Sequence, residues 1–208
     1  MARVSILVSG GGANLQSVLD SYHFRETPGM EIGAVISSVP GAYALERARS
    51  AGVPEYVVSR ALFPNHASFC NALLNKLRDL DTDLVVTAGL GEKLNYPITH
   101  FYRGRIIAVQ PALFPAFCEG GFEPVRALER TIKLGLRWTG ATAYFMAEED
   151  NGFGPVILQQ PVEVLQDDSM ASLQERIMRQ GEWVVLPRAV ALYCEGRLTL
   201  DGERVVIT

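Results

Sequence analysis

Near its beginning the sequence reads Ser9-Gly10-Gly11-Gly12-Ala13-Asn14-Leu15-Gln16, a glycine-rich segment between an apolar run and an amphipathic one. Glycines in such a turn let backbone N–H groups approach an anion, and the N-terminus of a following helix adds a favourable partial positive charge. The spacing is not the dinucleotide pattern G-x-G-x-x-G, and no Lys-Ser/Thr pair for a triphosphate follows. The segment predicts a site for a small phosphate or a phosphoribosyl group. The alternative is a tight strand-to-helix turn that needs glycine only for its backbone angles.

Apolar runs alternate with helical patterns around and after this segment. The expected strands are Arg3–Val8, Glu31–Ile36, Tyr56–Val58, Leu84–Ala88 and Arg105–Val109. The expected helices are Asn14–Tyr22, Ala42–Ala51, and one capped by Asn65 that carries Phe69, Leu73, Leu74, Leu77 and Leu80 on one side. Strands and helices that alternate at short intervals predict an α/β fold with a parallel, doubly wound sheet. Ligands of such sheets bind at the carboxyl ends of the strands, here the loops after Val8, Ala88 and Val109.

The second half of the chain has a different pattern. A helix is expected over Pro124–Leu134, followed by two β-like runs, Thr139–Met146 and Val156–Val164, which the acidic loop Glu148–Gly154 joins. A long amphipathic helix over Ser169–Cys194, with a kink at Pro187, precedes a hairpin of Arg197–Leu200 and Arg204–Ile207 around Asp201-Gly202. No repeat or linker interrupts the pattern, so residues 1–208 are predicted to form a single domain.

Composition excludes several classes of protein. The chain has 208 residues, of which 48% are apolar, and a formal charge of −4, which argues against disorder and against a broad basic face for nucleic acid. A local basic pocket for one phosphate is compatible with that charge. No apolar run approaches 18 residues, so no membrane span is predicted. Cys70, Cys118 and Cys194 are far apart and indicate reduced thiols in a cytoplasmic protein; Cys118, in a loop, is the one remote candidate for a nucleophile. No metal site is expected.

Several segments, in order along the chain, resemble those of the glycinamide ribonucleotide (phosphoribosylglycinamide) formyltransferase family. Ser9–Gln16 resembles its phosphate loop, and Asp83–Gly89 the strand that leads to its folate pocket. Pro111–Pro115 resembles its H-P-S-L-L-P segment, Thr139–Thr142 its T-G-x-T strand, and Gly154–Gln159 matches its G-P-V-I-L-Q almost letter for letter. Leu45–Ala48 and Ala51–Pro54 resemble its second β-α unit. The resemblance covers nearly the whole chain and implies the formyltransferase fold.

The resemblance also implies a function, a cosubstrate and a set of binding residues. Members of this family use 10-formyltetrahydrofolate to formylate the amine of glycinamide ribonucleotide in purine biosynthesis. By the resemblance, residues 1–100 are the phosphate-binding half and residues 101–208 the folate and catalytic half. The substrate-binding positions are Gly12, Ala13, Asn14 and Glu182, the last matching a glutamate near the substrate amine. The folate-binding positions are His66, Gly91, Glu92, Lys93 and Leu94.

The catalytic positions of the family carry other residues here. The family's N-x-H-P segment reads Ala108-Val109-Gln110-Pro111, so Asn is replaced by Ala108 and His by Gln110. The acidic loop is one residue longer than the family's, which places its Asp position on Asn151 or Gly152; Asp150 reaches that space only if the loop shifts. On the folate side, Glu92 replaces an arginine, and the family's other arginine falls near His66.

These replacements bear directly on the chemistry. Formyl transfer needs hydrogen-bond donors for the oxyanion and a group that moves protons. Glutamine donates hydrogen bonds but does not exchange a proton near pH 7. The other histidines, His23 and His100, are expected, like His66, at surface or capping positions. Loss of one oxyanion donor costs on the order of 10²–10³ in rate, and loss of acid–base help typically a further ~10²–10⁴.

Three hypotheses therefore stand. The first is a relative that keeps the phosphate-binding crevice but is catalytically impaired, with a phosphoribosyl compound or a folate as its ligand. The second is an active formyltransferase, on glycinamide ribonucleotide or a related amine, that uses Asp150 or Asn151 with Gln110. The third is a non-enzymatic interaction module. The oligomeric state stays open, with a homodimer as one arrangement, as does the existence of an intact paralogue.

Overall fold

The computed structural model describes residues 1–116, 124–148 and 152–208. Within that part, seven strands form one sheet in the order β3-β2-β1-β4-β5-β6-β7, and β8 pairs with β9 in a separate hairpin. The strands are β1 (Ala2–Val8), β2 (Met30–Ser37), β3 (Glu55–Val57), β4 (Leu84–Thr87), β5 (Ile106–Gln110), β6 (Trp138–Phe145), β7 (Val156–Glu163), β8 (Leu198–Asp201) and β9 (Arg204–Ile207). The helices are α1 (Ala13–His23), α2 (Tyr43–Ser50), α3 (His66–Asp79), α4 (Ile98–Phe101), α5 (Pro124–Lys133), α6 (Met170–Ile177) and α7 (Trp183–Cys194), with a 3-10 turn η1 (Arg60–Leu62) and a π-helical turn η2 (Met178–Glu182).

The strand directions confirm the predicted doubly wound, mostly parallel sheet. Strand β1 pairs in parallel with β2 on one side and β4 on the other, and β4 pairs in parallel with β5. Strands β6 and β7 extend the sheet in antiparallel fashion. Because the chain runs from β1 outward to β2 and later returns to β4 on the opposite side, the carboxyl ends of β1 and β4 flank the point where ligands of such sheets bind.

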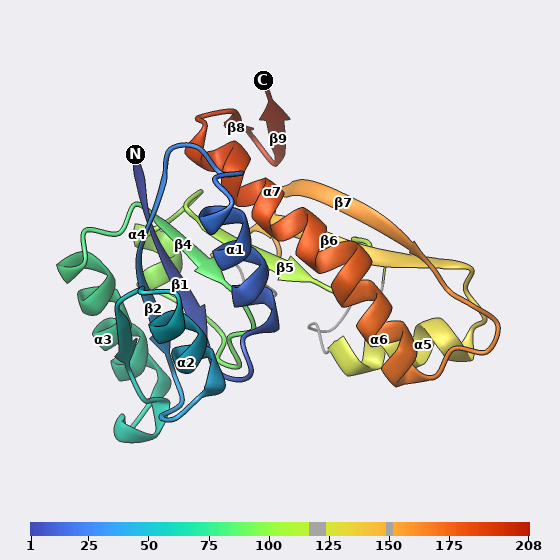
Figure 1. Ribbon diagram of the computed structural model, residues 1–208, viewed down its shortest axis with the longest axis horizontal. Helices are drawn as coiled ribbons and strands as arrows, with labels where there is room; N and C mark the ends of the chain where they lie inside the picture. Colours follow the sequence, from blue (N-terminus) through green and yellow to red (C-terminus); the bar gives the residue numbers. More distant parts are fainter. Residues whose placement is uncertain (117–123, 149–151) are drawn as a thin grey trace.

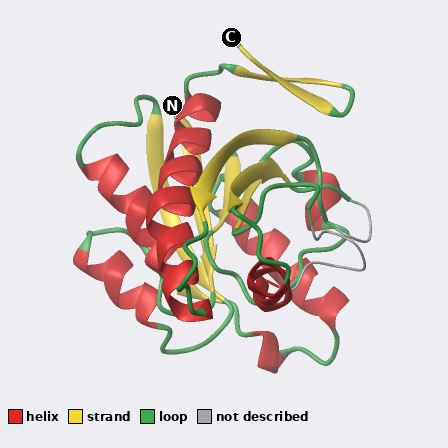
Figure 2. Ribbon diagram, turned by 90° about the vertical axis from the view of Figure 1, so that its right-hand side faces the viewer, coloured by secondary structure: helices red, strands yellow, loops and turns green. Residues whose placement is uncertain are grey.

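Successive residues of the central strands pack on opposite faces of the sheet. Ile6 and Ile107 belong to the apolar cluster under α1 and α7, whereas Leu7 and Ile106 belong to the cluster under α3 and α4. Helices α1 and α7 lie side by side across one face (Figure 1), and the β8–β9 hairpin stands apart from the main sheet (Figure 2). Strands buried on both faces explain why the sequence shows continuous apolar runs there.

Most predicted elements are present, with ends that differ by no more than one residue. Asn65 caps α3 as expected, since its side chain accepts a hydrogen bond from the Ser68 N–H at 2.8 Å. The hairpin at the end of the chain is also confirmed. The long helix expected over Ser169–Cys194 is confirmed as a continuous helical run over Met170–Cys194, in which the π turn η2 lies between α6 and α7. Pro187, where a kink was expected, lies inside α7, and the irregular turn η2 precedes it.

Two local causes account for the position of the π turn. Pro187 has no N–H to offer the carbonyl four residues earlier, and its ring crowds that carbonyl, so the helix adjusts on its N-terminal side. Gly181 lies in the turn against β6, where an added Cβ would come within 2.9 Å of the Ala141 Cβ. The glycine therefore allows the helix junction to approach the sheet closely, and it places Glu182 at the next position.

The turn between β1 and α1 depends on Gly12. Its φ of +73° lies in the left-handed region that other residues rarely adopt. A Cβ at this position would also come within 2.8 Å of the Ala44 Cβ in α2. Both constraints require glycine at position 12, while Gly10 and Gly11 have no atom within 4 Å of an added Cβ.

Two aromatic side chains of β6 differ in exposure, and both described cysteines are free thiols. Trp138, the first residue of β6, is 58% exposed, whereas Tyr144 in the same strand is 5% exposed. Cys70 and Cys194 are free thiols, and burial raises the pKa of both, that of Cys194 to about 11. Neither thiol is therefore a ready nucleophile. Cys118 lies outside the described residues.

No helix in the described residues is long and apolar enough to cross a bilayer.

The start of α6 is held by a buried ion pair. Asp168 receives hydrogen bonds from the Arg176 guanidinium, with an Nη2–Oδ1 distance of 2.7 Å, and from the Leu165 N–H and the Ser172 hydroxyl. The Asp168 side chain is 3% exposed. Its hydrogen bonds with Arg176 are the main cause that lowers the pKa of the Asp168 carboxyl to about 2.

We expect Asp168→Asn to destabilise the protein by about 1–2 kcal/mol at pH 7. Each unit of pKa shift corresponds to roughly 1.4 kcal/mol of stability, and solvent screening reduces this contribution. A carboxyl whose native pKa lies below its ordinary 3.8 contributes stability above that value, and this contribution is lost as the pH falls toward 2. Urea unfolding at pH 7, 5 and 3 should therefore show a difference that shrinks with falling pH. Asp201→Asn, in an exposed pair with Arg204, is the control and should change stability by less than about 0.5 kcal/mol. An equal loss at pH 3 and pH 7 would contradict the assignment.

We expect Gly12→Ala to destabilise the protein by about 2–4 kcal/mol, because it adds both left-handed strain and a clash with α2. Gly10→Ala is the matched control, since that position is open, and it should leave the melting temperature nearly unchanged. Thermal unfolding of both variants measures the difference. Equal stability of the two variants would show that the turn is not constrained as described.

Candidate functional site

The loop after β1 presents the N-terminus of α1 at the ligand-binding edge of the sheet. Among the described residues, no side chain caps this helix; its N-cap is Gly12, whose carbonyl accepts the first helical hydrogen bond from the Gln16 N–H at 2.9 Å. Arg47 of α2 braces the loop by donating from Nε to the Gly11 carbonyl at 2.8 Å and from Nη1 to the Gln16 side chain at 2.9 Å. Uncapped N–H groups and a neighbouring guanidinium are features that favour an anion.

Ser9 connects three loops at this edge. Its hydroxyl lies 2.7 Å from the Ser38 hydroxyl after β2 and accepts a hydrogen bond from the Gly91 N–H after β4 at 2.8 Å. Its own N–H donates to the Gly89 carbonyl at 3.1 Å. The carboxyl ends of β1, β2 and β4 are therefore joined through one side chain, which fixes the glycine-rich loop relative to the predicted folate segment.

Asn14 and Glu182, 168 positions apart in the sequence, meet at the start of α1. The Asn14 Nδ2 donates to the Glu182 Oε1 at 3.1 Å. The structure thus brings together two of the four expected substrate-binding residues, with Gly12 and Ala13 adjoining them in the chain. The contact joins the first helix of the fold to the junction of α6 and α7.

Burial raises the pKa of the Glu182 carboxyl above the ordinary glutamate value of 4.5, and the hydrogen bond from Asn14 partly opposes this shift. A carboxyl held away from water without a cationic partner destabilises the native state when it is ionised. Such an arrangement is typical of a group kept for a ligand and not for stability.

Ala108 and Gln110 lie at the carboxyl end of β5, as expected. Across the antiparallel pair, Ala108 faces Tyr144 and Gln110 faces Thr142. Because Ile107 and Val109 pack on the α1/α7 side, Ala108 and Gln110 project to the opposite side of the sheet. Glu182 approaches the edge from the α1/α7 side, so a ligand that touches both Glu182 and Gln110 must cross the edge of the sheet.

The loop after β5 is anchored by Thr142 and Gln159. The Thr142 hydroxyl donates to the Ala112 carbonyl at 2.7 Å and accepts from the Phe114 N–H at 3.2 Å. The Gln159 amide donates to the Thr142 hydroxyl at 3.0 Å and to the Phe114 carbonyl at 3.1 Å. These contacts explain why the T-G-x-T and G-P-V-I-L-Q segments occur together: both hold the loop that follows Gln110.

An aromatic cluster fills the space beside Ala108. The rings of Phe114 and Phe153 are 4.6 Å apart between centroids, those of Phe114 and Tyr144 are 4.9 Å apart, and those of Tyr144 and Phe153 are 5.7 Å apart. The cluster packs the loop after β5 against the loop before β7. The surroundings of the expected catalytic positions are thus apolar on this side.

The acidic loop is only partly described. Asp150 and Asn151 lie outside the described residues. Gly152, the alternative match for the family's aspartate, has a φ of +72° and no side chain to offer. The Glu148 carboxylate lies 3.2 Å from the His100 Nδ1 in an exposed pair with α4. In the described part of the loop, therefore, no carboxylate is directed at Gln110 by a recorded contact.

The five expected folate positions do come together after β4. The His66 Nε2 donates to the Lys93 carbonyl at 2.6 Å, and its Nδ1 lies 4.0 Å from the Glu92 carboxylate, which Arg60 also approaches at 4.0 Å. His66 begins α3 and is thus held against this segment, with its side chain 30% exposed. Two backbone groups of the segment already have partners: the Lys93 carbonyl accepts from His66, and the Gly91 N–H donates to Ser9. Leu94, 3% exposed, is a core residue and not a free contact.

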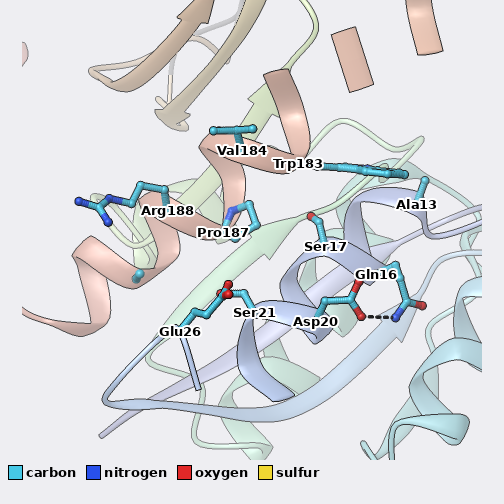
Figure 3. A pocket seen from close by; sticks show the side chains of 11 residues that line it. Ala13, Gln16, Ser17, Asp20, Ser21, Glu26, Trp183, Val184, Pro187 and Arg188 are labelled. Carbon is cyan, nitrogen blue, oxygen red and sulfur yellow. Dashed lines mark hydrogen bonds between the residues drawn. The ribbon is translucent and has the colours of Figure 1, made fainter. Parts of the chain in front are cut away.

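A cavity of about 410 Å³ lies on the outer side of α1, between α1 and α7. Figure 3 shows Ser17, Asp20 and Ser21 on the α1 side and Pro187 and Arg188 on the α7 side, with the Trp183 indole reaching from the start of α7 to Ala13. Sequence reasoning missed this cavity. No local pattern could have indicated it, because the cavity depends on how α1 packs against α7.

Metal ligands are not grouped in the described residues. No cluster of three or more His, Cys, Asp or Glu side chains there has the proximity to hold a metal ion.

Comparison with known proteins agrees with this geometry. The model of the family described as "Formyl transferase" matches residues 2–190. The phosphoribosylglycinamide formyltransferase of Haemophilus influenzae is 32% identical over 203 residues, which are 98% of this chain and 92% of that protein. The enzyme of the same name from Escherichia coli (strain K12) is 31% identical over 209 residues, 97% of this chain and 95% of that protein.

A solved structure gives the same result. The crystal structure of glycinamide ribonucleotide transformylase 1 from Symbiobacterium toebii superimposes with a TM-score of 0.91 and 36% identity, over 100% of this chain and 94% of that chain. A match of this extent in both sequence and fold establishes the relationship: the chain belongs to the formyl transferase family, with the phosphoribosylglycinamide formyltransferases as its relatives.

Proposed function

We propose that this protein binds a phosphoribosyl amine of the glycinamide ribonucleotide type, with 10-formyltetrahydrofolate as formyl donor, and that its catalysis is impaired. The observation that supports the binding most strongly is the Asn14–Glu182 hydrogen bond at the uncapped N-terminus of α1. It combines an anion-binding terminus with a carboxyl group suited to an amine or a hydroxyl, which are the two ends of such a substrate.

The impairment follows from what formyl transfer requires. The amine attacks the formyl carbon, the carbonyl oxygen becomes an oxyanion, and a proton must leave the amine as the folate nitrogen receives one. Ala108 offers no donor to the oxyanion, and Gln110 offers a donor but no proton exchange near pH 7. Beside them lies the aromatic cluster of Phe114, Tyr144 and Phe153, which is poorly suited to relay a proton.

A second candidate is an active formyltransferase on glycinamide ribonucleotide or a related amine. It is favoured by Gln110, which is only half-buried at the end of β5 and keeps a donor for the oxyanion. Asp150 or Asn151 would then complete the site. We place either activity in the cytoplasm, where free thiols such as Cys70 and Cys194 are the norm.

Binding and turnover measurements distinguish these candidates. We expect glycinamide ribonucleotide to raise the melting temperature, since a ligand that prefers the native state stabilises it. We also expect turnover with 10-formyltetrahydrofolate to fall several orders of magnitude below the roughly 10 s⁻¹ typical of enzymes. Turnover near that typical value would instead support the second candidate. The absence of a shift with either the substrate or a folate analogue would overturn the proposal and favour an interaction module.

Glu182→Gln should separate function from stability. A carboxyl whose native pKa is raised contributes stability below the ordinary value of 4.5 and loses it as the pH rises through the native pKa. At pH 7 the amide side chain of the variant carries no charge to bury, so we expect the Glu182→Gln variant to melt at a higher temperature than the natural sequence. At pH 4 we expect the variant to have no such advantage. We also expect the affinity for glycinamide ribonucleotide to fall by about tenfold or more, because a hydrogen bond to a charged group is lost.

Glu175→Gln is the matched control for that experiment. Glu175 pairs with Arg179 on the exposed side of the same helical region, and its loss should change neither melting temperature nor affinity appreciably. If Glu182→Gln destabilised the protein at pH 7 while leaving affinity unchanged, Glu182 would be a structural residue.

A further inference from the structure

Two buried polar atoms beside Glu182 lack a hydrogen-bond partner among the described residues. They are the Oδ1 of Asn14, whose Nδ2 holds the glutamate, and the Nε1 of Trp183, the next residue in the chain. Native proteins pair the great majority of their buried donors and acceptors, and an unpaired one costs about 1–3 kcal/mol. One of these atoms belongs to the residue that holds the Glu182 carboxyl group and the other to its neighbour in the chain, an arrangement that favours a ligand as their partner.

The local fold sets the position of the Trp183 indole. Gly181 packs closely on Ala141, so the π turn η2 fixes where α7 begins and which way residue 183 points. From there the indole reaches Ala13 in the first turn of α1 (Figure 3). This is the turn whose N–H groups no side chain caps. The ring therefore covers the proposed phosphoribosyl site on its α7 side.

We propose that Trp183 is a substrate-positioning residue whose indole lies over the first turn of α1 and whose N–H donates to an oxygen of the bound phosphorylated sugar. The proposal rests on the proposed function and adds a residue to it. An apolar core role is the competing explanation, because tryptophan also fills space. A phenylalanine would serve that purpose without burying an unpaired N–H, which is why the indole nitrogen favours a ligand contact.

The chain contains two tryptophans, which makes the proposal directly measurable. Trp138→Phe removes the exposed tryptophan at the start of β6, so the remaining emission comes from Trp183. Trp183→Phe does the opposite and serves as the functional variant. Each variant is titrated with ribose 5-phosphate, inorganic phosphate and glycinamide ribonucleotide, and tryptophan emission and calorimetric Kd are recorded.

We expect ribose 5-phosphate and glycinamide ribonucleotide to change the emission of the Trp138→Phe protein and to leave that of the Trp183→Phe protein unchanged. We also expect Trp183→Phe to raise the Kd of both ligands by about five- to tenfold, the effect of one lost hydrogen bond at 1.4 kcal/mol per tenfold. The Kd of the Trp138→Phe protein should equal that of the natural sequence.

Several other results decide against the proposal. An unchanged Kd in Trp183→Phe, or ligand binding that leaves Trp183 emission constant, overturns the role of Trp183 while the proposed function stands. Failure of the natural sequence to bind any of the three ligands overturns both. If Trp183→Phe does not fold, as judged by circular dichroism, the emission of the Trp138→Phe protein alone decides the matter.

Discussion

The backbone turn at Gly12 is the constraint on which the rest of the structure depends. Its left-handed conformation lets α1 begin directly after β1, and its missing side chain lets α2 approach within contact of the turn. The N-terminus of α1 consequently points at the edge of the sheet with its N–H groups uncapped, next to the Arg47 guanidinium. A residue with a side chain at position 12 would move either helix and, with it, the only strongly anion-binding feature that the loop provides.

The second half of the chain completes what this turn begins. The close approach of Gly181 to β6 and the wider π turn around it bring Glu182 onto Asn14, so the proposed phosphate-binding site includes a residue of the second half of the chain. That arrangement opposes stability, because it buries a carboxyl group with a raised pKa and two unpaired polar atoms. Proteins tolerate such groups mainly where a ligand interacts with them, and the stability that supports them comes from pairs such as Asp168–Arg176.

Much of the fold could be predicted because its signals are local. Apolar runs, the Asn65 cap and the Asp201-Gly202 turn each depend on neighbouring residues, and the alternation of elements then determines a parallel sheet. The π turn could not be predicted, because it arises from a long-range contact of Gly181 as well as from Pro187. Likewise, the pairing of the Gly91 N–H with Ser9 depends on how three loops meet, and no spacing in the sequence reveals it. Residues carried over from the family, such as Glu182, were located by resemblance, and the structure supplies the contact with Asn14.

The most direct test of the account is to locate the bound anion by NMR. Inorganic phosphate is titrated into isotopically labelled protein, and the backbone amide shifts are followed residue by residue. The account predicts that the largest shifts occur at Gly11 to Leu15, the loop and first turn of α1, with a single dissociation constant. Largest shifts at another site, with those amides unchanged, would contradict the assignment of this turn as the phosphate site.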